Sequence, residues 1–126
     1  MNDRRDAEQM PLLDMREALE HLSGKTQLYI HMLAVFRKEY ADVDAHLEEL
    51  LREGDGVQAA RLAHKLKGAA AHIGAGRLSG LAGELERRLA GHARHDDAAR
   101  LLAQLKTALM ASLEEIGRTA ERLTQR

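Results

Sequence analysis

The sequence predicts an all-α protein, and three observations support this fold class. Alanine, leucine, glutamate and arginine, which form helices readily, dominate the 126 residues, whereas aromatic residues are scarce, with two tyrosines, one phenylalanine and no tryptophan. A single proline interrupts the chain. Apolar residues recur every three or four positions between glycines, as in amphipathic helices. We therefore expect an antiparallel up-down four-helix bundle with a short additional N-terminal helix packed at one end.

The first two helices are expected in the N-terminal half of the chain. The first begins near Pro11, because proline suits an opening helical turn, and it stops at Ser23 and Gly24. The second is long, covers about residues 26–53 with apolar positions at helical spacing, and ends at Gly54.

Three further helices complete the expected bundle. The third follows Asp55, a suitable cap, and ends at Gly74, which we expect in the left-handed backbone conformation. The fourth covers about residues 77–90, and Gly91 closes it. The last begins near Asp96 and carries leucines at helical spacing. The loops are short, which makes consecutive helices antiparallel neighbours.

Length and composition limit the domain organisation and the class of partner. The 126 residues suit one domain, which we place at residues 11–126, after a flexible N-terminal tail of residues 1–10. No apolar run approaches the length of a membrane span, and the start is polar, so we expect a cytoplasmic protein without membrane insertion. The formal net charge of −1 gives no case for nucleic acid binding, and the absence of cysteine excludes disulfides and thiolate metal sites.

One histidine of the third helix is expected to face solvent. With Leu66 taken as the centre of the apolar side, His64 lies roughly 160° away around the helix, given 100° per residue. Burying His64 would expose Leu62, Leu66 and Ile73, so a core histidine is disfavoured. An incidental surface histidine remains as the alternative to a functional one.

The neighbours of His64 favour a phosphoryl acceptor. A neutral imidazole, with a reference pKa near 6.5, offers a nucleophilic nitrogen at pH 7. Lys67, one turn on, can make a charge-assisted contact with a phosphoryl group. Gly68, on the same side, has no side chain to obstruct an in-line approach, although a mid-helix glycine costs about 1 kcal/mol relative to alanine. We expect no cofactor or metal ion bound by the chain itself.

The same residues carry a family resemblance. The run from Ala63 to Gly68, followed by Gly74, resembles the signature of histidine-containing phosphotransfer (Hpt) domains of two-component phosphorelays. The resemblance covers about residues 12–116. It implies that His64 accepts a phosphoryl group from a receiver-domain aspartate and passes it to a response-regulator aspartate. It also implies that Lys67 stabilises the phosphate, that Gly68 gives steric access, and that any magnesium ion belongs to the receiver. Further matching residues are Ala18, Leu19, Ser23, Gly24, Phe36, Leu85 and Glu86.

The resemblance further implies a docking surface for a partner. Arg61 and Lys65 can face the acidic pocket of a receiver domain, and Ala60 and Ala71 can form part of an apolar centre. The expected partners are receiver domains of response regulators or of a hybrid sensor histidine kinase, and the protein is expected to be a monomer. His72, two turns beyond His64, is interpreted as a surface histidine.

Two other interpretations stay open. The chain can be an interaction-only adaptor, a degenerate Hpt domain that binds receivers without accepting phosphate. It can also be the phosphoacceptor domain of a chemotaxis-type or hybrid histidine kinase, because such domains share the pattern His-x-x-Lys-Gly. The sequence contains no nucleotide-binding glycine box, so we expect a phosphoryl carrier without autokinase activity rather than an enzyme.

Overall fold

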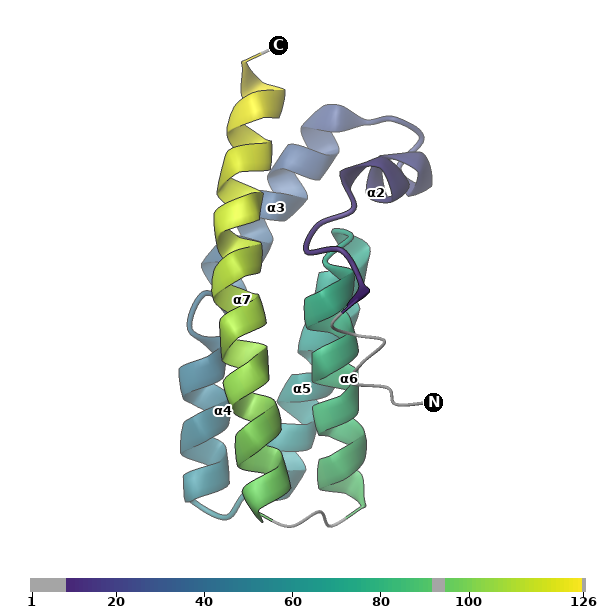
Figure 1. Cartoon of the computed structure of the whole chain (residues 1–126). Coiled ribbons are helices and arrows are strands. Elements are labelled where there is room, and N and C mark those ends of the chain that lie inside the picture. Colours follow the sequence, from purple (N-terminus) through teal and green to yellow (C-terminus); the bar gives the residue numbers. More distant parts are fainter. Residues whose placement is uncertain (1–8, 92–94, 126) are drawn as a thin grey trace.

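The computed structural model describes residues 9–91 and 95–125, and in this part of the chain the regular elements are helices (Figure 1). The predicted all-α class is therefore confirmed. No helix among the described residues is both long and apolar enough to span a membrane. The tail predicted for residues 1–10 falls almost wholly outside the described residues. The helices are α2 (Met15–His21), α3 (Thr26–Tyr40), α4 (Val43–Arg52), α5 (Gly56–His72), α6 (Gly76–Ala90) and α7 (His95–Thr124).

Helices α4 to α7 lie side by side, and α3 leads into α4 (Figure 1). Helix α5 packs along α6, α6 packs against α7, and α4 contacts both α5 and α7. Helix α2 lies over the turn where α5 passes into α6, beside the parts of α3 and α7 that extend beyond that turn (Figure 1). The core is formed by the apolar faces of these helices, and its largest fully buried side chains include Tyr29, Leu33, Leu47, Leu66 and Leu85.

The prediction of one continuous helix over residues 26–53 is wrong. Helix α3 ends at Tyr40 and α4 begins at Val43, because the backbone of Asp42 leaves the helical region with φ −111° and ψ 19°. Aspartate is a poor residue for a helix interior, since its short polar side chain competes for nearby backbone groups. The hydrophobic pattern conceals the break, because the buried residues keep spacings of three, four or seven across it: Tyr29, Leu33, Phe36, Val43 and Leu47.

The first helix also begins later than predicted. Helix α2 starts at Met15 behind Asp14, whose carboxylate accepts a hydrogen bond from the amide of Glu17 at 3.1 Å. Pro11 lies outside the helix, and its carbonyl oxygen accepts a hydrogen bond from the amide of Arg77 at 3.1 Å. The side-chain oxygen of an aspartate cap accepts a hydrogen bond from a free amide of the first turn. Proline has no side-chain oxygen and cannot form this bond.

Gly74 fixes the turn between α5 and α6. Its φ of +86° confirms the predicted left-handed conformation. The amide of Ala75 donates to the carbonyl of Ala70 at 2.8 Å, and the amide of Gly74 donates to that of Ala71 at 3.1 Å, which is the paired arrangement that ends many helices. The Gly74 carbonyl accepts from the amide of Asp14 at 2.8 Å, and a Cβ at Gly74 would overlap the Asp14 carbonyl. The glycine therefore sets both the turn and the position of α2.

We expect Gly74→Ala to lower the free energy of unfolding by about 2–4 kcal/mol, because a Cβ adds left-handed strain and collides with the backbone of Asp14. Thermal unfolding followed by circular dichroism measures the change. Gly68→Ala is the matched control, since a Cβ at Gly68 has no neighbouring atom within 4 Å. That control is expected to stabilise the protein by up to about 1 kcal/mol. Equal melting temperatures for Gly74→Ala and the wild type would contradict the analysis of this turn.

Candidate functional site

His64 projects from the middle of α5 into solvent, as the helical periodicity predicted. Its side chain is 65% exposed. The opposite side of the same helix contributes Ala63 and Leu66 to the core, and both are fully buried. The rigid bundle therefore holds an accessible imidazole in a defined place on its surface.

Glu86, on α6, joins His64 to Lys67. One carboxylate oxygen, Oε2, lies 2.8 Å from Nδ1 of His64, and the other, Oε1, lies 3.0 Å from Nζ of Lys67. An ionised carboxylate only accepts hydrogen bonds, so Nδ1 carries the proton in this contact. In the neutral imidazole, Nε2 then keeps its lone pair and is the nucleophilic nitrogen.

The ionisation of Glu86 follows from its surroundings. Partial burial raises the pKa of this carboxyl group, but the hydrogen bond and charge of Lys67, followed by those of His64, outweigh it. The pKa of Glu86 consequently lies below its ordinary value of 4.5. At neutral pH the Glu86 carboxylate is therefore charged, and it accepts hydrogen bonds from both the His64 imidazole and the Lys67 ammonium.

Gly68 has no packing reason to be glycine. It lies in the interior of α5 with an exposed surface, and a Cβ built on it would meet no atom within 4 Å. By contrast, a Cβ on Gly74 or Gly83 would meet atoms of the protein itself. The space left by Gly68 opens outward, on the side of the helix that carries His64.

The residues predicted to dock a partner lie on the exposed side of α5. Arg61, Lys65 and Ala71 are exposed, and Ala60 is half-buried. Val57 was not among the predicted docking residues, although it is 65% exposed and lies roughly 20° from His64 around the helix. The same periodicity that located His64 would have found Val57.

Glu86 was named only as part of the family resemblance, and its contact with His64 was not anticipated. The two residues are 22 positions apart and lie on different helices. No spacing rule within one helix can bring them together. The sequence signal for this pair is therefore the resemblance alone.

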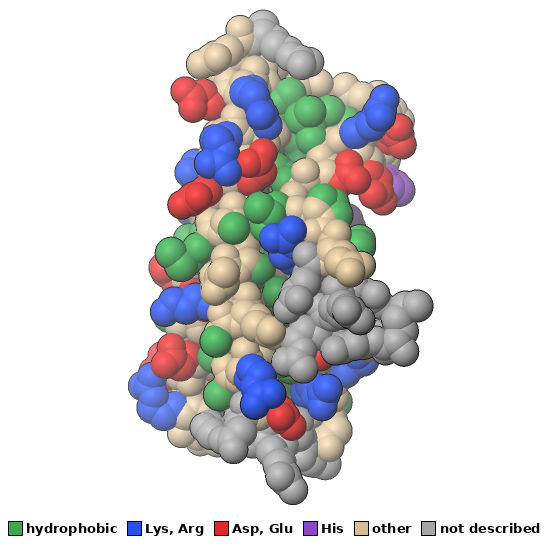
Figure 2. Space-filling view, in the orientation of Figure 1, with side chains coloured by type: hydrophobic (Ala, Val, Ile, Leu, Met, Phe, Trp, Pro, Cys, Tyr) green, Lys and Arg blue, Asp and Glu red, His purple; other side chains and the backbone are tan. Residues whose placement is uncertain are grey.

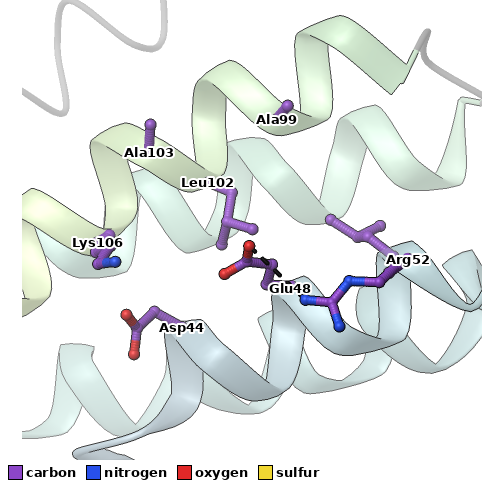
Figure 3. Close-up of a pocket in the computed structure, with 8 residues that line it drawn as sticks. Asp44, Glu48, Arg52, Ala99, Leu102, Ala103 and Lys106 are labelled. Atoms are coloured by element: carbon purple, nitrogen blue, oxygen red, sulfur yellow. Dashed lines mark ion pairs between the residues drawn. The ribbon is translucent and has the colours of Figure 1, made fainter.

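A separate groove of about 370 Å³ lies between α4 and α7 (Figure 3). Asp44, Glu48 and Arg52 of α4 face Leu102 and Lys106 of α7 there, and Glu48 pairs with Arg52 at 3.9 Å. The groove is lined by both acidic and basic side chains, and none of the predicted site residues lines it.

Acidic and basic side chains are likewise mixed over the face shown in Figure 2. Among residues that the structure describes, no group of three histidine or carboxylate side chains is placed to hold a metal ion.

Comparison with known proteins identifies the family. The family model for the Hpt domain matches residues 31–119, from α3 to α7. The chain belongs to the Hpt domain family. No curated protein and no solved structure matches it. Membership assigns this Hpt domain to histidine phosphotransfer in two-component systems and to interaction with receiver domains. The matched segment contains His64, Lys67, Gly68 and Glu86.

In this Hpt domain, we expect Glu86→Gln to lower stability by about 1 kcal/mol or less at pH 7, because the contacts are partly exposed. A carboxylate whose pKa is lowered by folding stabilises the protein above its unfolded pKa. That stabilisation disappears as the pH falls through the lower folded value. The free energies of unfolding of wild type and variant, measured with urea, should therefore become equal as the pH falls from 5 to about 3. If the two free energies of unfolding still differ by the same amount at pH 3, the loss of stability in Glu86→Gln does not come from the charge of the carboxylate.

Proposed function

We propose that this Hpt domain carries a phosphoryl group on Nε2 of His64 between receiver-domain aspartates. The observation that supports the proposal is the 2.8 Å contact between Nδ1 of His64 and the Glu86 carboxylate. This contact selects the tautomer with a lone pair on Nε2, and the imidazole is exposed to a partner. An interaction-only adaptor has no need of such a contact.

In the proposed transfer, every bond and electron pair is accounted for by groups of the Hpt domain and the receiver. The lone pair of Nε2 attacks the phosphorus of an aspartyl phosphate, the bond from phosphorus to the aspartate oxygen breaks, and its electron pair returns to the carboxylate. The ring keeps its proton on Nδ1 and becomes positively charged, and the adjacent Glu86 carboxylate offsets that charge. The same steps in reverse deliver the phosphoryl group to a second aspartate.

Lys67 supplies the positive charge that the phosphoryl group requires. A phosphoryl group on His64 brings nearly two negative charges. The ammonium of Lys67 binds the same carboxylate as Nδ1 of the imidazole, at 3.0 Å, so it is held near the ring that reacts. Phosphoryl transfer depends mainly on such positioning and electrostatics.

The proposal extends to the partner surface. Arg61 and Lys65 face the acidic pocket of the receiver, and Ala60 and Ala71 contact its apolar rim, with Val57 at the edge. The partners are receiver domains of response regulators or of a hybrid sensor kinase. The receiver supplies any magnesium ion, and this domain binds no cofactor.

We also propose the finer organisation of the protein. Residues 11–126 form one antiparallel up-down four-helix bundle with α2 at one end, which acts as a monomeric cytoplasmic carrier without autokinase activity. The short connections and the packing of α5 on α6 and of α6 on α7 support this arrangement.

We expect His64→Gln to abolish labelling by a phosphorylated receiver domain, because the amide has no nucleophilic nitrogen. The melting temperature should change by no more than about 2 °C, since the side chain is exposed. Labelling is measured with radioactive phosphate, and the product should be acid-labile and base-stable. His72→Gln, an exposed histidine on the same helix, is the control and should be labelled normally. Labelling of His64→Gln would refute the assignment, and an unlabelled wild type would favour the adaptor.

Gly68→Leu should slow transfer at least about tenfold, because a branched side chain occupies the outward space through which the receiver approaches. Circular dichroism should show an unchanged fold, since that space contains no atom of the domain. The measurement is the initial rate of transfer at several receiver concentrations. The rate for Gly68→Ala should lie between those of the wild type and Gly68→Leu. Transfer by Gly68→Leu at the wild-type rate would eliminate the steric role.

A further inference from the structure

Gly83 is a buried glycine in the interior of α6. Among the described residues, the glycines with positive φ are Gly24, Gly54 and Gly74, so backbone conformation gives no reason for glycine at position 83. A glycine inside a helix destabilises it relative to alanine. The reason for Gly83 therefore lies in what packs against it.

The side chain of Lys67 occupies the space above Gly83. A Cβ built on Gly83 would lie 3.1 Å from Cδ and 3.8 Å from Cγ of Lys67, and 3.6 Å from Nη1 of Arg87. The first of these distances is closer than ordinary van der Waals contact, so the Lys67 stem would have to move. The aliphatic stem thus crosses α6 at Gly83, where the helix has no side chain.

Two neighbouring residues of α6 bind the other parts of Lys67. The hydroxyl of Ser79 donates a hydrogen bond to the Lys67 carbonyl at 2.9 Å, and Glu86 binds the ammonium at 3.0 Å. Positions 79, 83 and 86 are spaced by four and three residues, so they share one face of the helix. Each part of Lys67 therefore contacts one residue of this face: Ser79 binds the backbone, Gly83 lies against the stem, and Glu86 binds the ammonium.

We infer that Gly83 is a positioning residue for phosphotransfer: it holds the stem of Lys67 against α6, so that the ammonium reaches Glu86 and a phosphoryl group on His64. The inference rests on the proposed function of His64. An alanine at position 83 shifts the stem by a few tenths of an ångström, and the flexible lysine then moves its ammonium away from Glu86 without unfolding the helix. Ser79 assists by fixing the Lys67 backbone to the same face.

The test is a double-mutant cycle on the initial rate of transfer from a phosphorylated receiver. Gly83→Ala alone should slow transfer by about threefold to fivefold, since the Lys67 stem must shift by a few tenths of an ångström and a misplacement of about 1 Å can cost about a hundredfold in rate. In a Lys67→Ala background the same change should alter the rate by less than about twofold, because there is no ammonium left to displace. Equal effects in both backgrounds, or an unchanged rate for Gly83→Ala alone, would overturn the inference.

A matched control removes the effect of helix propensity. Gly117→Ala also places alanine inside a helix, α7, where the nearest atoms belong to the guanidinium at the far end of the Arg37 side chain. It should transfer phosphate at the wild-type rate. If Gly83→Ala fails to fold in thermal unfolding experiments, Ser79→Ala removes the neighbouring contact without adding bulk. Its loss of rate must likewise depend on Lys67, and an effect independent of Lys67 would overturn the inference.

A readout independent of activity separates this inference from the proposed function. The hydrogen bond and charge of Lys67 are the main influences that lower the pKa of Glu86, against the opposing effect of burial. In Gly83→Ala, NMR titration of the carboxyl carbon should therefore show the pKa of Glu86 moving upward, and in Gly117→Ala it should not move. An unmoved pKa in Gly83→Ala refutes the positioning role. A moved pKa together with an unlabelled wild type would show that Gly83 positions Lys67 against Glu86 but would refute the proposed function, and with it the role in phosphotransfer.

Discussion

The Glu86 carboxylate connects the two helices on which the site depends. Its two oxygens bind an imidazole and an ammonium that both come from α5, while the carboxylate itself belongs to α6. The close packing of α5 along α6 is what brings these groups within hydrogen-bond distance. The tautomer of His64 and the place of the Lys67 ammonium both follow from this one carboxylate, and these two groups in turn keep Glu86 charged.

Three glycines near the site illustrate different physical demands. Gly74 is needed for its left-handed backbone and for the close approach of Asp14. Gly83 makes room for the stem of Lys67, inside the domain. A Cβ on Gly68 would meet no atom of the domain within 4 Å, so the space that this glycine leaves opens outward. Backbone geometry explains Gly74 and internal packing explains Gly83, whereas neither explains Gly68.

Local features of the site could be predicted from the sequence, and tertiary ones could not. The exposure of His64 and the conformation of Gly74 follow from helical periodicity and from the freedom of glycine at a helix end. The contact between His64 and Glu86 requires the register of two helices, which no pattern within either specifies. The break at Asp42 escaped prediction because the buried residues keep their spacing across it, and the late start of α2 reflects a cap at Asp14.

Under the proposed function, the division of the site between α5 and α6 makes phosphoryl acceptance a property of the folded chain. A peptide with the sequence of α5 contains the acceptor histidine, the lysine and the glycine, yet it lacks the carboxylate that orients the imidazole. The imidazole and the carboxylate that contacts it are brought together only by the folded bundle, although the local sequence of α5 is complete without it.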